Sequence, residues 1–389
     1  MRNKRIKKAL LFLVVVICLT LTNILFLCAA TEYVPVVIGG KTISHYNTGG
    51  TVSMPATYVV DSAEMRGAWV QTVWNGDMPK QKGDTEKAIN EYKARFLEVL
   101  DTLEKYNINT IFFQIRPCND AFYVSEYNDW SEFLVGIGKD PGWDPLEWMI
   151  EETHKRSMYF MGWMNAFRVT TDKCFPNDLA INHSDQELIE AKQRALSNLT
   201  AKNFARQHPE CTLMGDYDSK LILNPGDPLV HEHIVRSLEE IATNYDIDGY
   251  HFDDYFYPDA RPADLDSQKY NRAFAGGTVY NELLTGENIM NDLPTYKDYQ
   301  ENPDKYDLPS GLELGEFRRQ SVNNMMRKIR EMVDRVNETY GKHVEYGTKP
   351  AAVWQSNYDY CHDSRTVVGG SNTHCGAYSS NYDLFADTK

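Results

Sequence analysis

Apolar residues follow two alternating patterns along the chain from Met65 onward. Short runs that are apolar at nearly every position, such as 110–116 and 159–165, are typical of strands buried on both faces. The longer stretches between them, such as 85–107, have apolar residues three or four positions apart, which is the spacing of one face of a helix. Strands that alternate with helices in this way predict a parallel sheet covered by helices.

The pattern predicts five main strands and five main helices. The predicted strands are 65–73, 110–116, 159–165, 247–255 and 343–354. The predicted helices are 85–107, 144–158, 184–206, 227–245 and 313–340. Two of the helices, at positions 144 and 227, begin with an aspartate followed by a proline, and this pair of residues is typical of a helix start.

A parallel sheet of this kind is either open and doubly wound or closed into a barrel. No G-x-G-x-x-G motif follows the first strand and no G-x-x-x-x-G-K-[ST] motif occurs in the sequence, so the commonest reason for an open nucleotide-binding sheet is missing. We therefore predict an α/β fold, a (β/α)8 TIM-type barrel. Because such a barrel has eight strands and the pattern predicts five, we expect the barrel to be incomplete at the C-terminus.

Residues 258–312 are rich in Pro, Asp and Tyr and interrupt the pattern after the fourth strand. They predict a long insertion. Insertions at this point border the active face of a barrel, so the segment is either a lid or subsite wall, or it is surface decoration.

The first thirty residues differ in kind from the rest. Five basic residues precede an uncharged apolar run at 9–27, which predicts an export signal at 1–30. The run is also long enough to span a bilayer, so residues 9–30 are alternatively a membrane tether. Residues 31–62 predict a linker or a segment leading into the barrel domain at 63–389. We expect an exported protein that is extracellular or held in the cell envelope.

Charge and cysteine content narrow the choice of partners. Beyond residue 30 the chain carries 35 basic and 55 acidic side chains, a formal charge of −20, so nucleic acid is not an expected partner. The five cysteines of this part are widely spaced without a C-x-x-C pair, which indicates neither a zinc site nor a disulfide framework. We expect no metal and no cofactor. The sequence does not indicate an oligomeric state.

Polar and aromatic residues gather directly after the predicted strands. The carboxyl ends of barrel strands all converge on one face, so these residues predict a single pocket. They are Trp74 and Asn75, Arg116 and Asp120, Asn165 and Arg168, Asn224, and Asp253 and Asp254.

Five blocks of sequence, in this order, resemble a known family. The blocks are "MRGAWVQTV", "FFQIRPCNDAFY", "GWMNAFRV", "LNPGDPLV" and "DGYHFDDYFYP". Together they resemble the glycosyl-hydrolase-like family 10, envelope proteins with a TIM-type barrel, from about Met65 to the last residue. The family pattern continues beyond that residue, which agrees with an incomplete barrel. The resemblance implies a glycosidase acting on bacterial envelope glycans, notably peptidoglycan strands without stem peptides.

Glycosidic cleavage generally needs one protonated and one ionised carboxyl group. Asp253 is the first choice for the ionised group, because it lies at the end of the fourth strand, whereas Asp248 lies at the opposite end. Asp254 cannot point into the same barrel while the strand stays regular. It either curls over the rim to form an acid and base pair with Asp253, or it caps the following loop. The general acid is not assigned.

The remaining candidates are interpreted as sugar-holding groups. Arg116 and Asn165 suit directed hydrogen bonds to hydroxyls, although Arg116 could instead pair with Asp120 or another carboxylate. Asn224 is either a ligand donor or the start of a turn. Aromatic rings that a sugar can rest on, and the other lining candidates, are Trp74, Trp163, Tyr255, Arg168 and His251. His251 is expected to be a hydrogen-bonded barrel residue and not a metal ligand, and His231 and His233 to be surface residues.

The sequence thus favours a glycoside hydrolase that acts on envelope polysaccharide by carboxylate chemistry. The alternative is a glycan-binding envelope protein on a barrel scaffold without catalytic activity. A strand-end carboxylate favours the first function, and the missing general acid favours the second.

Overall fold

The computed structural model describes residues 33–38, 40–42, 51, 53–55, 64–178, 180–215, 219–253 and 292–348 of the 389. The chain divides into two units, 1–64 and 65–389. In the first unit, β1 (Tyr33–Pro35) pairs with β4 (Ser53–Pro55), and β2 (Val37–Ile38) pairs with β3 (Lys41–Thr42). Both pairs are antiparallel and lie within the predicted linker.

The predicted export signal lies outside the described residues. Among the helices that the structure describes, none is both long enough and apolar enough to cross a membrane.

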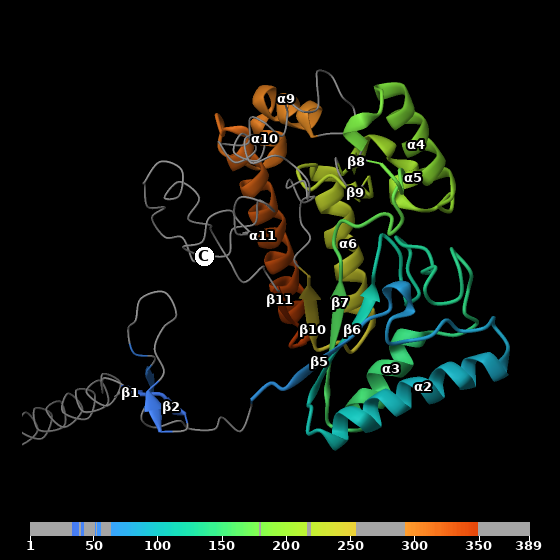
Figure 1. The fold of residues 1–389 in the computed structure, drawn as a ribbon, viewed down its shortest axis with the longest axis vertical. Helices are drawn as coiled ribbons and strands as arrows, with labels where there is room; N and C mark the ends of the chain where they lie inside the picture. Colours follow the sequence, from blue (N-terminus) through green and yellow to red (C-terminus); the bar gives the residue numbers. More distant parts are fainter. Residues whose placement is uncertain are drawn as a thin grey trace, which may run out of the picture. The chain divides into compact units, whose positions relative to one another are not determined.

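A five-stranded sheet organises the second unit, with the strands side by side in sequence order (Figure 1). They are β5 (Gly67–Val70), β6 (Thr110–Arg116), β7 (Tyr159–Met164), β10 (Gly249–Phe252) and β11 (Glu345–Thr348). All four pairings are parallel, which confirms the predicted parallel sheet. Within the described residues, β5 and β11 are the two edges and the sheet does not close.

The main helices begin where the sequence predicts. They are α2 (Glu86–Lys105), α3 (Pro145–His154), α6 (Pro228–Asn244) and α11 (Leu314–Tyr340). Asp144 and Asp227 each accept backbone N–H groups of the first turn, so the two Asp-Pro pairs cap their helices as expected. α6 and α11 lie side by side (Figure 1).

The predicted helix at 184–206 is wrong in its second half. α4 (Asp185–Ser197) ends at Ser197, and a separate short helix, α5 (Phe204–Gln207), follows a loop. An antiparallel hairpin of β8 (Thr212–Met214) and β9 (Leu221–Leu223) comes next, outside the main sheet. Three short 3-10 turns cover Val73–Asn75, Ala180–Asn182 and Pro209–Cys211.

The two faces of the sheet differ in what covers them. Phe113 of β6 packs against Phe96 of α2 with ring centroids 5.6 Å apart, and the Tyr250 hydroxyl donates to the Leu238 carbonyl of α6. This face therefore forms the helix-covered core. Side chains alternate along a strand, so the opposite face carries Phe112, Trp163 and His251 instead.

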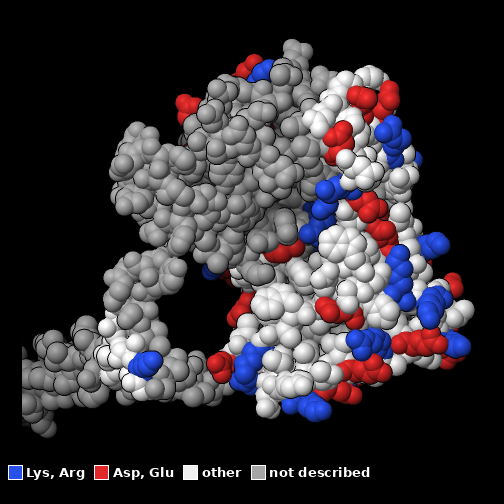
Figure 2. All heavy atoms as spheres, in the orientation of Figure 1, with Lys and Arg blue, Asp and Glu red and all other residues white. Residues whose placement is uncertain are grey.

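Figure 2 shows one side of the molecule, on which acidic and basic side chains are interspersed over α2 and α3. Arg156 at the end of α3 donates to Asp101 of α2 at 2.9 Å, which joins the two helices at the surface.

The described part of the predicted insertion forms α9 (Leu293–Glu301) and α10 (Pro303–Tyr306). A fully buried ion pair attaches this part to α11, because the Arg318 guanidinium donates to both carboxylate oxygens of Asp292, at 2.6 and 2.7 Å. A small cluster of aromatic residues, including Tyr299 and Phe317, surrounds the junction.

Gly249 allows β10 to approach its neighbours closely. A Cβ atom there would lie 2.6 Å from the Glu345 carbonyl oxygen of β11 and 2.6 Å from the Met161 methyl of β7. We therefore expect Gly249→Ala to lower the free energy of unfolding by about 1–3 kcal/mol, measured by urea denaturation. Gly347→Ala is the matched control on β11, since a Cβ there meets nothing within 4 Å. Equal stability of the two variants would contradict this packing.

Candidate active site

Asp253 directly follows β10 at the carboxyl edge of the sheet. Its carboxylate Oδ1 accepts a hydrogen bond from the Asn165 side-chain amide at 2.8 Å, and its Oδ2 lies 4.0 Å from the Arg168 guanidinium. The Asp253 side chain is 11% exposed, so it is close to the surface without being free in solvent. An amide donor and a cation are partners that suit a carboxylate anion. The structure thus brings together three of the predicted site residues.

The loop that carries Asn165 and Arg168 is held by backbone hydrogen bonds. The Asn165 side-chain oxygen accepts the Arg168 N–H at 2.7 Å, which folds the loop into a tight turn. The loop also pairs with β9 through an isolated antiparallel bridge: the Leu223 N–H donates to the Phe167 carbonyl, and the Val169 N–H donates to the Leu221 carbonyl. Both side chains that approach Asp253 are therefore mounted on rigid backbone.

Arg116, at the end of β6, lies buried behind this loop and is 2% exposed. Its Nη1 donates to the carbonyls of Asn165 and Ala166 at 3.0 and 3.1 Å, and its Nη2 donates to the Asn119 side chain at 2.6 Å. Its Nε lies 3.4 Å from the Asn128 side-chain oxygen. The predicted grip on sugar hydroxyls does not match this geometry, because the donors of the guanidinium are directed at protein groups. Arg116 positions the Asn165 loop.

The alternative prediction for Arg116, a pair with Asp120, is met in part, since the two charges attract one another while the hydrogen bonds of the guanidinium go to other groups. Asp120 lies in the loop after β6 and is 9% exposed. Its Oδ1 accepts the Cys118 backbone N–H at 3.0 Å. Burial raises the pKa of Asp120 to about 6, despite the hydrogen bonds that oppose the shift.

The histidines of α6 are buried, so the prediction that they lie on the surface is wrong. His231 and His233 are 3% and 7% exposed. His233 Nε2 lies 2.8 Å from the Asn119 side-chain oxygen, which also accepts from Arg116. His231 Nε2 lies 2.7 Å from the Pro225 carbonyl. Burial lowers the pKa of His233 to about 3, so its imidazole is neutral near pH 7.

Asn224 forms a turn, which is the second of its two predicted roles. Its side-chain oxygen accepts the Gly226 N–H at 2.9 Å, and its amide donates to the Thr295 hydroxyl of α9 at 2.7 Å. The residue is 1% exposed. It therefore attaches the insertion to the turn before α6.

Aromatic residues line the same face of the sheet as Asp253, which lies two positions after His251. Phe112 and Trp69 stack on one another with centroids 4.9 Å apart, and the His251 ring of β10 packs edge-on against both, at 4.8 and 5.5 Å. Trp163 of β7 lies opposite His251 in the strand register, and its indole Nε1 is buried without a partner among the described residues. In the part of the chain that the structure describes, no group of three or more potential metal ligands occurs.

Trp74 lies just beyond β5 and is 59% exposed. Trp74 and Asn75 both have a φ of 53°, in the left-handed region that residues other than glycine rarely adopt. The Gln114 side-chain oxygen fixes this turn by accepting the Thr72 and Val73 N–H groups at 3.1 and 2.9 Å. The strained backbone holds an exposed indole at the carboxyl edge of the sheet. Asp254 and Tyr255, the other two candidates, lie outside the described residues.

A model of the family described as "Glycosyl hydrolase-like 10" matches residues 64–370. The chain belongs to this family. The match confirms the resemblance inferred from the five sequence blocks.

Two proteins similar to this chain carry the name glycosyl hydrolase. YngK of Bacillus subtilis is 33% identical over 328 residues, which cover 84% of this chain and 51% of YngK. DigH of Escherichia coli is 28% identical over 341 residues, which cover 86% of this chain and 64% of DigH. The chain therefore spans about half to two thirds of the length of these relatives. Among solved structures, α-L-fucosidase isoenzyme 2 of Paenibacillus thiaminolyticus aligns over 72% of this chain and 32% of its own, with 14% identity and a TM-score of 0.36.

The raised pKa of Asp120 predicts a pH-dependent cost to stability. The folded protein holds this proton more tightly than the unfolded chain, so the stabilisation is complete below about pH 4 and is lost as the pH rises through about 6. Asp120→Asn has no proton to lose at this position, so its stability does not fall with pH for this reason. Relative to wild type, the variant should gain up to about 3 kcal/mol in unfolding free energy between pH 4 and pH 7.

Urea denaturation at several pH values in this range measures the difference. Glu104→Gln, which changes an exposed carboxylate on α2, is the control. A difference between Asp120→Asn and wild type that stays constant with pH would exclude a buried proton at Asp120.

Proposed function

We propose that the protein hydrolyses glycosidic bonds in a bacterial envelope polysaccharide, and that its substrate is peptidoglycan glycan strands without stem peptides. The observation that carries the proposal is the Asp253 carboxylate, held by Asn165 and Arg168 at the carboxyl edge of a parallel sheet. Membership of the glycosyl hydrolase-like 10 family supports the reaction class. The complete sheet is proposed to be a TIM-type barrel, in which such an edge forms the active face.

Asp253 is proposed as the ionised carboxyl group, which attacks the sugar or activates a water molecule. The Asn165 amide directs one carboxylate oxygen, and the guanidinium of Arg168 supports the charge on the other. Arg116 is too deeply buried to contact the sugar, and it acts by fixing the carbonyls of Asn165 and Ala166. Asp254 is proposed as the second carboxyl group.

Aromatic side chains would support the sugar rings. The exposed indole of Trp74 suits stacking on the apolar face of a sugar, and the unpartnered indole N–H of Trp163 suits a hydrogen bond to a hydroxyl group. Tyr255 is proposed as a further lining residue. Export of the protein, by a cleaved signal or with residues 9–30 as a tether, would place the site where the polysaccharide is found.

Replacement of the Asp253 carboxylate by an amide is the direct test. Asp253→Asn preserves the size of the side chain and removes its charge, so the release of reducing ends from peptide-free glycan strands should fall by about 10²–10⁴-fold. Asp101→Asn, an exposed change on α2, should leave the rate unchanged. Circular dichroism and thermal unfolding would show that both variants fold.

The wild-type protein must turn over the polymer for the proposal to stand. If wild type binds the glycan strands without releasing reducing ends, and Asp253→Asn binds them equally well, the protein is a glycan-binding protein and not a hydrolase.

A further inference from the structure

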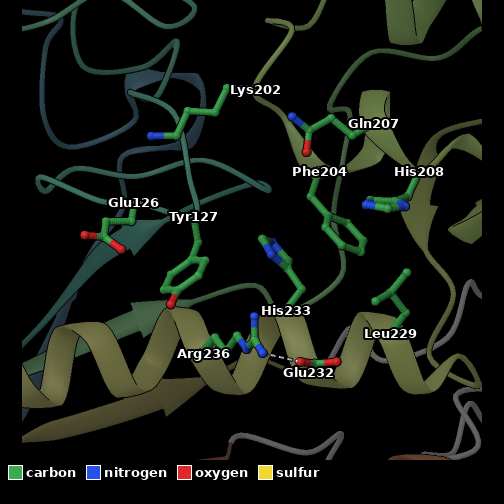
Figure 3. A pocket seen from close by; sticks show the side chains of 10 residues that line it. All are labelled: Glu126, Tyr127, Lys202, Phe204, Gln207, His208, Leu229, Glu232, His233 and Arg236. Atoms are coloured by element: carbon green, nitrogen blue, oxygen red, sulfur yellow. Dashed lines mark ion pairs between the residues drawn. The ribbon is translucent and has the colours of Figure 1, made fainter.

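One pocket of the described part of the chain is lined by none of the groups that hold Asp253. It has a volume of about 330 Å³ and lies between the loop after β6, α5 and the first half of α6 (Figure 3). Neither Asn165 nor Arg168 lines it. Its volume is at the lower end of the range for small-molecule sites, which suits a ligand of one or two small rings.

Stacked rings form the floor of this pocket. The Phe204 ring of α5 and the His233 imidazole of α6 lie almost parallel, with centroids 4.1 Å apart and an interplanar angle of 13°. His208 packs against the same Phe204 ring at 4.7 Å. Figure 3 shows these three rings grouped together, with Tyr127 to one side and Leu229 below. Phe204 and His233 are each only 7% exposed, so the apolar surface that a ligand can reach comes from Tyr127, Leu229 and a small part of these rings, which suits the apolar side of a small ring.

The rim is polar but has little net charge. Arg236 forms an ion pair with Glu232 at 2.5 Å, and the two lie on neighbouring turns of α6 (Figure 3). Lys202 donates to two backbone carbonyls of the loop after β6, at 2.7 and 3.2 Å. The imidazole of His233 is neutral near pH 7 because burial lowers its pKa. One acidic residue, Glu126, offsets the Lys202 charge. An uncharged ligand with several hydroxyl groups fits this lining better than an anion does.

We infer that this pocket binds a single uncharged sugar unit of a glycan, at a site separate from Asp253. A polymer long enough to reach both sites would then be held at two points, which raises its effective affinity without any new contact at the first site. The statement that both sites hold the same polymer rests on the proposed function. Binding in the pocket does not.

Hydrogen–deuterium exchange of the full chain tests the inference segment by segment. The Asp253→Asn protein is used so that the ligand is not consumed. The probes are three uncharged tetrasaccharides, made of N-acetylglucosamine, β-linked glucose or α-linked glucose, and tetragalacturonic acid as a charged comparison. At least one uncharged probe should slow exchange in segments 202–208 and 229–236, which form the pocket.

Leu229→Trp is the blocking variant, because Leu229 lines the pocket, is 39% exposed and can be enlarged without entering the core. The indole should fill the pocket. The ligand concentration that gives half of the full protection should therefore rise at least tenfold. Lys87→Trp places the same ring at an exposed position on α2 and should leave the protection unchanged.

Three results would overturn the inference: protection of these segments by none of the uncharged probes, protection by the charged probe alone, or protection that Leu229→Trp leaves intact. Because the measurement is made on a variant without the Asp253 carboxylate, a failure here is distinct from a failure of wild type to release reducing ends.

Discussion

The buried guanidinium of Arg116 is the interaction on which the candidate site depends. Arg116 is the last residue of β6, and its side chain is buried. Its hydrogen bonds fix the start of the loop after β7 and the polar side chains of the loop after β6. A buried cation without such partners would cost several kcal/mol, so the loops and the arginine require each other. Asn165, whose carbonyl Arg116 holds, is also the residue whose side-chain amide donates to Asp253.

Much of the fold was accessible from the sequence because it depends on local pattern. Runs such as 110–116 predicted the strands, and their alternation with helices predicted the parallel sheet that the structure contains. The strand predicted at 65–73 proved shorter, since the backbone N–H groups of Thr72 and Val73 bond to the Gln114 side chain in a turn and not to a neighbouring strand. The closing of the sheet into a barrel is not a local property and stays a prediction.

The features that the sequence did not reveal depend on contacts between distant residues. His233 is separated by 114 positions from Asn119, and its polar side chain gave no sign that a buried partner exists. The break in the helix predicted at 184–206 is set by side chains that compete for the backbone, because Asn203 accepts the Ala205 N–H and starts a new helix. Of the site residues, the placement of Asp253 after its strand was accessible, whereas the burial of Arg116 was not, since a charged residue at a strand end normally indicates exposure.

The hairpin of β8 and β9 has a consequence for the energetics of binding. By pairing with residues 167–170, it removes the conformational freedom of the segment that carries Arg168 when the chain folds. A ligand that arrives next to Asp253 therefore meets groups already in place, and little of its interaction energy is lost to ordering them. Substitutions that loosen the hairpin would then weaken the affinity for such a ligand, because residues 167–170 would have to lose conformational entropy on binding. The direct contacts of the ligand would stay the same.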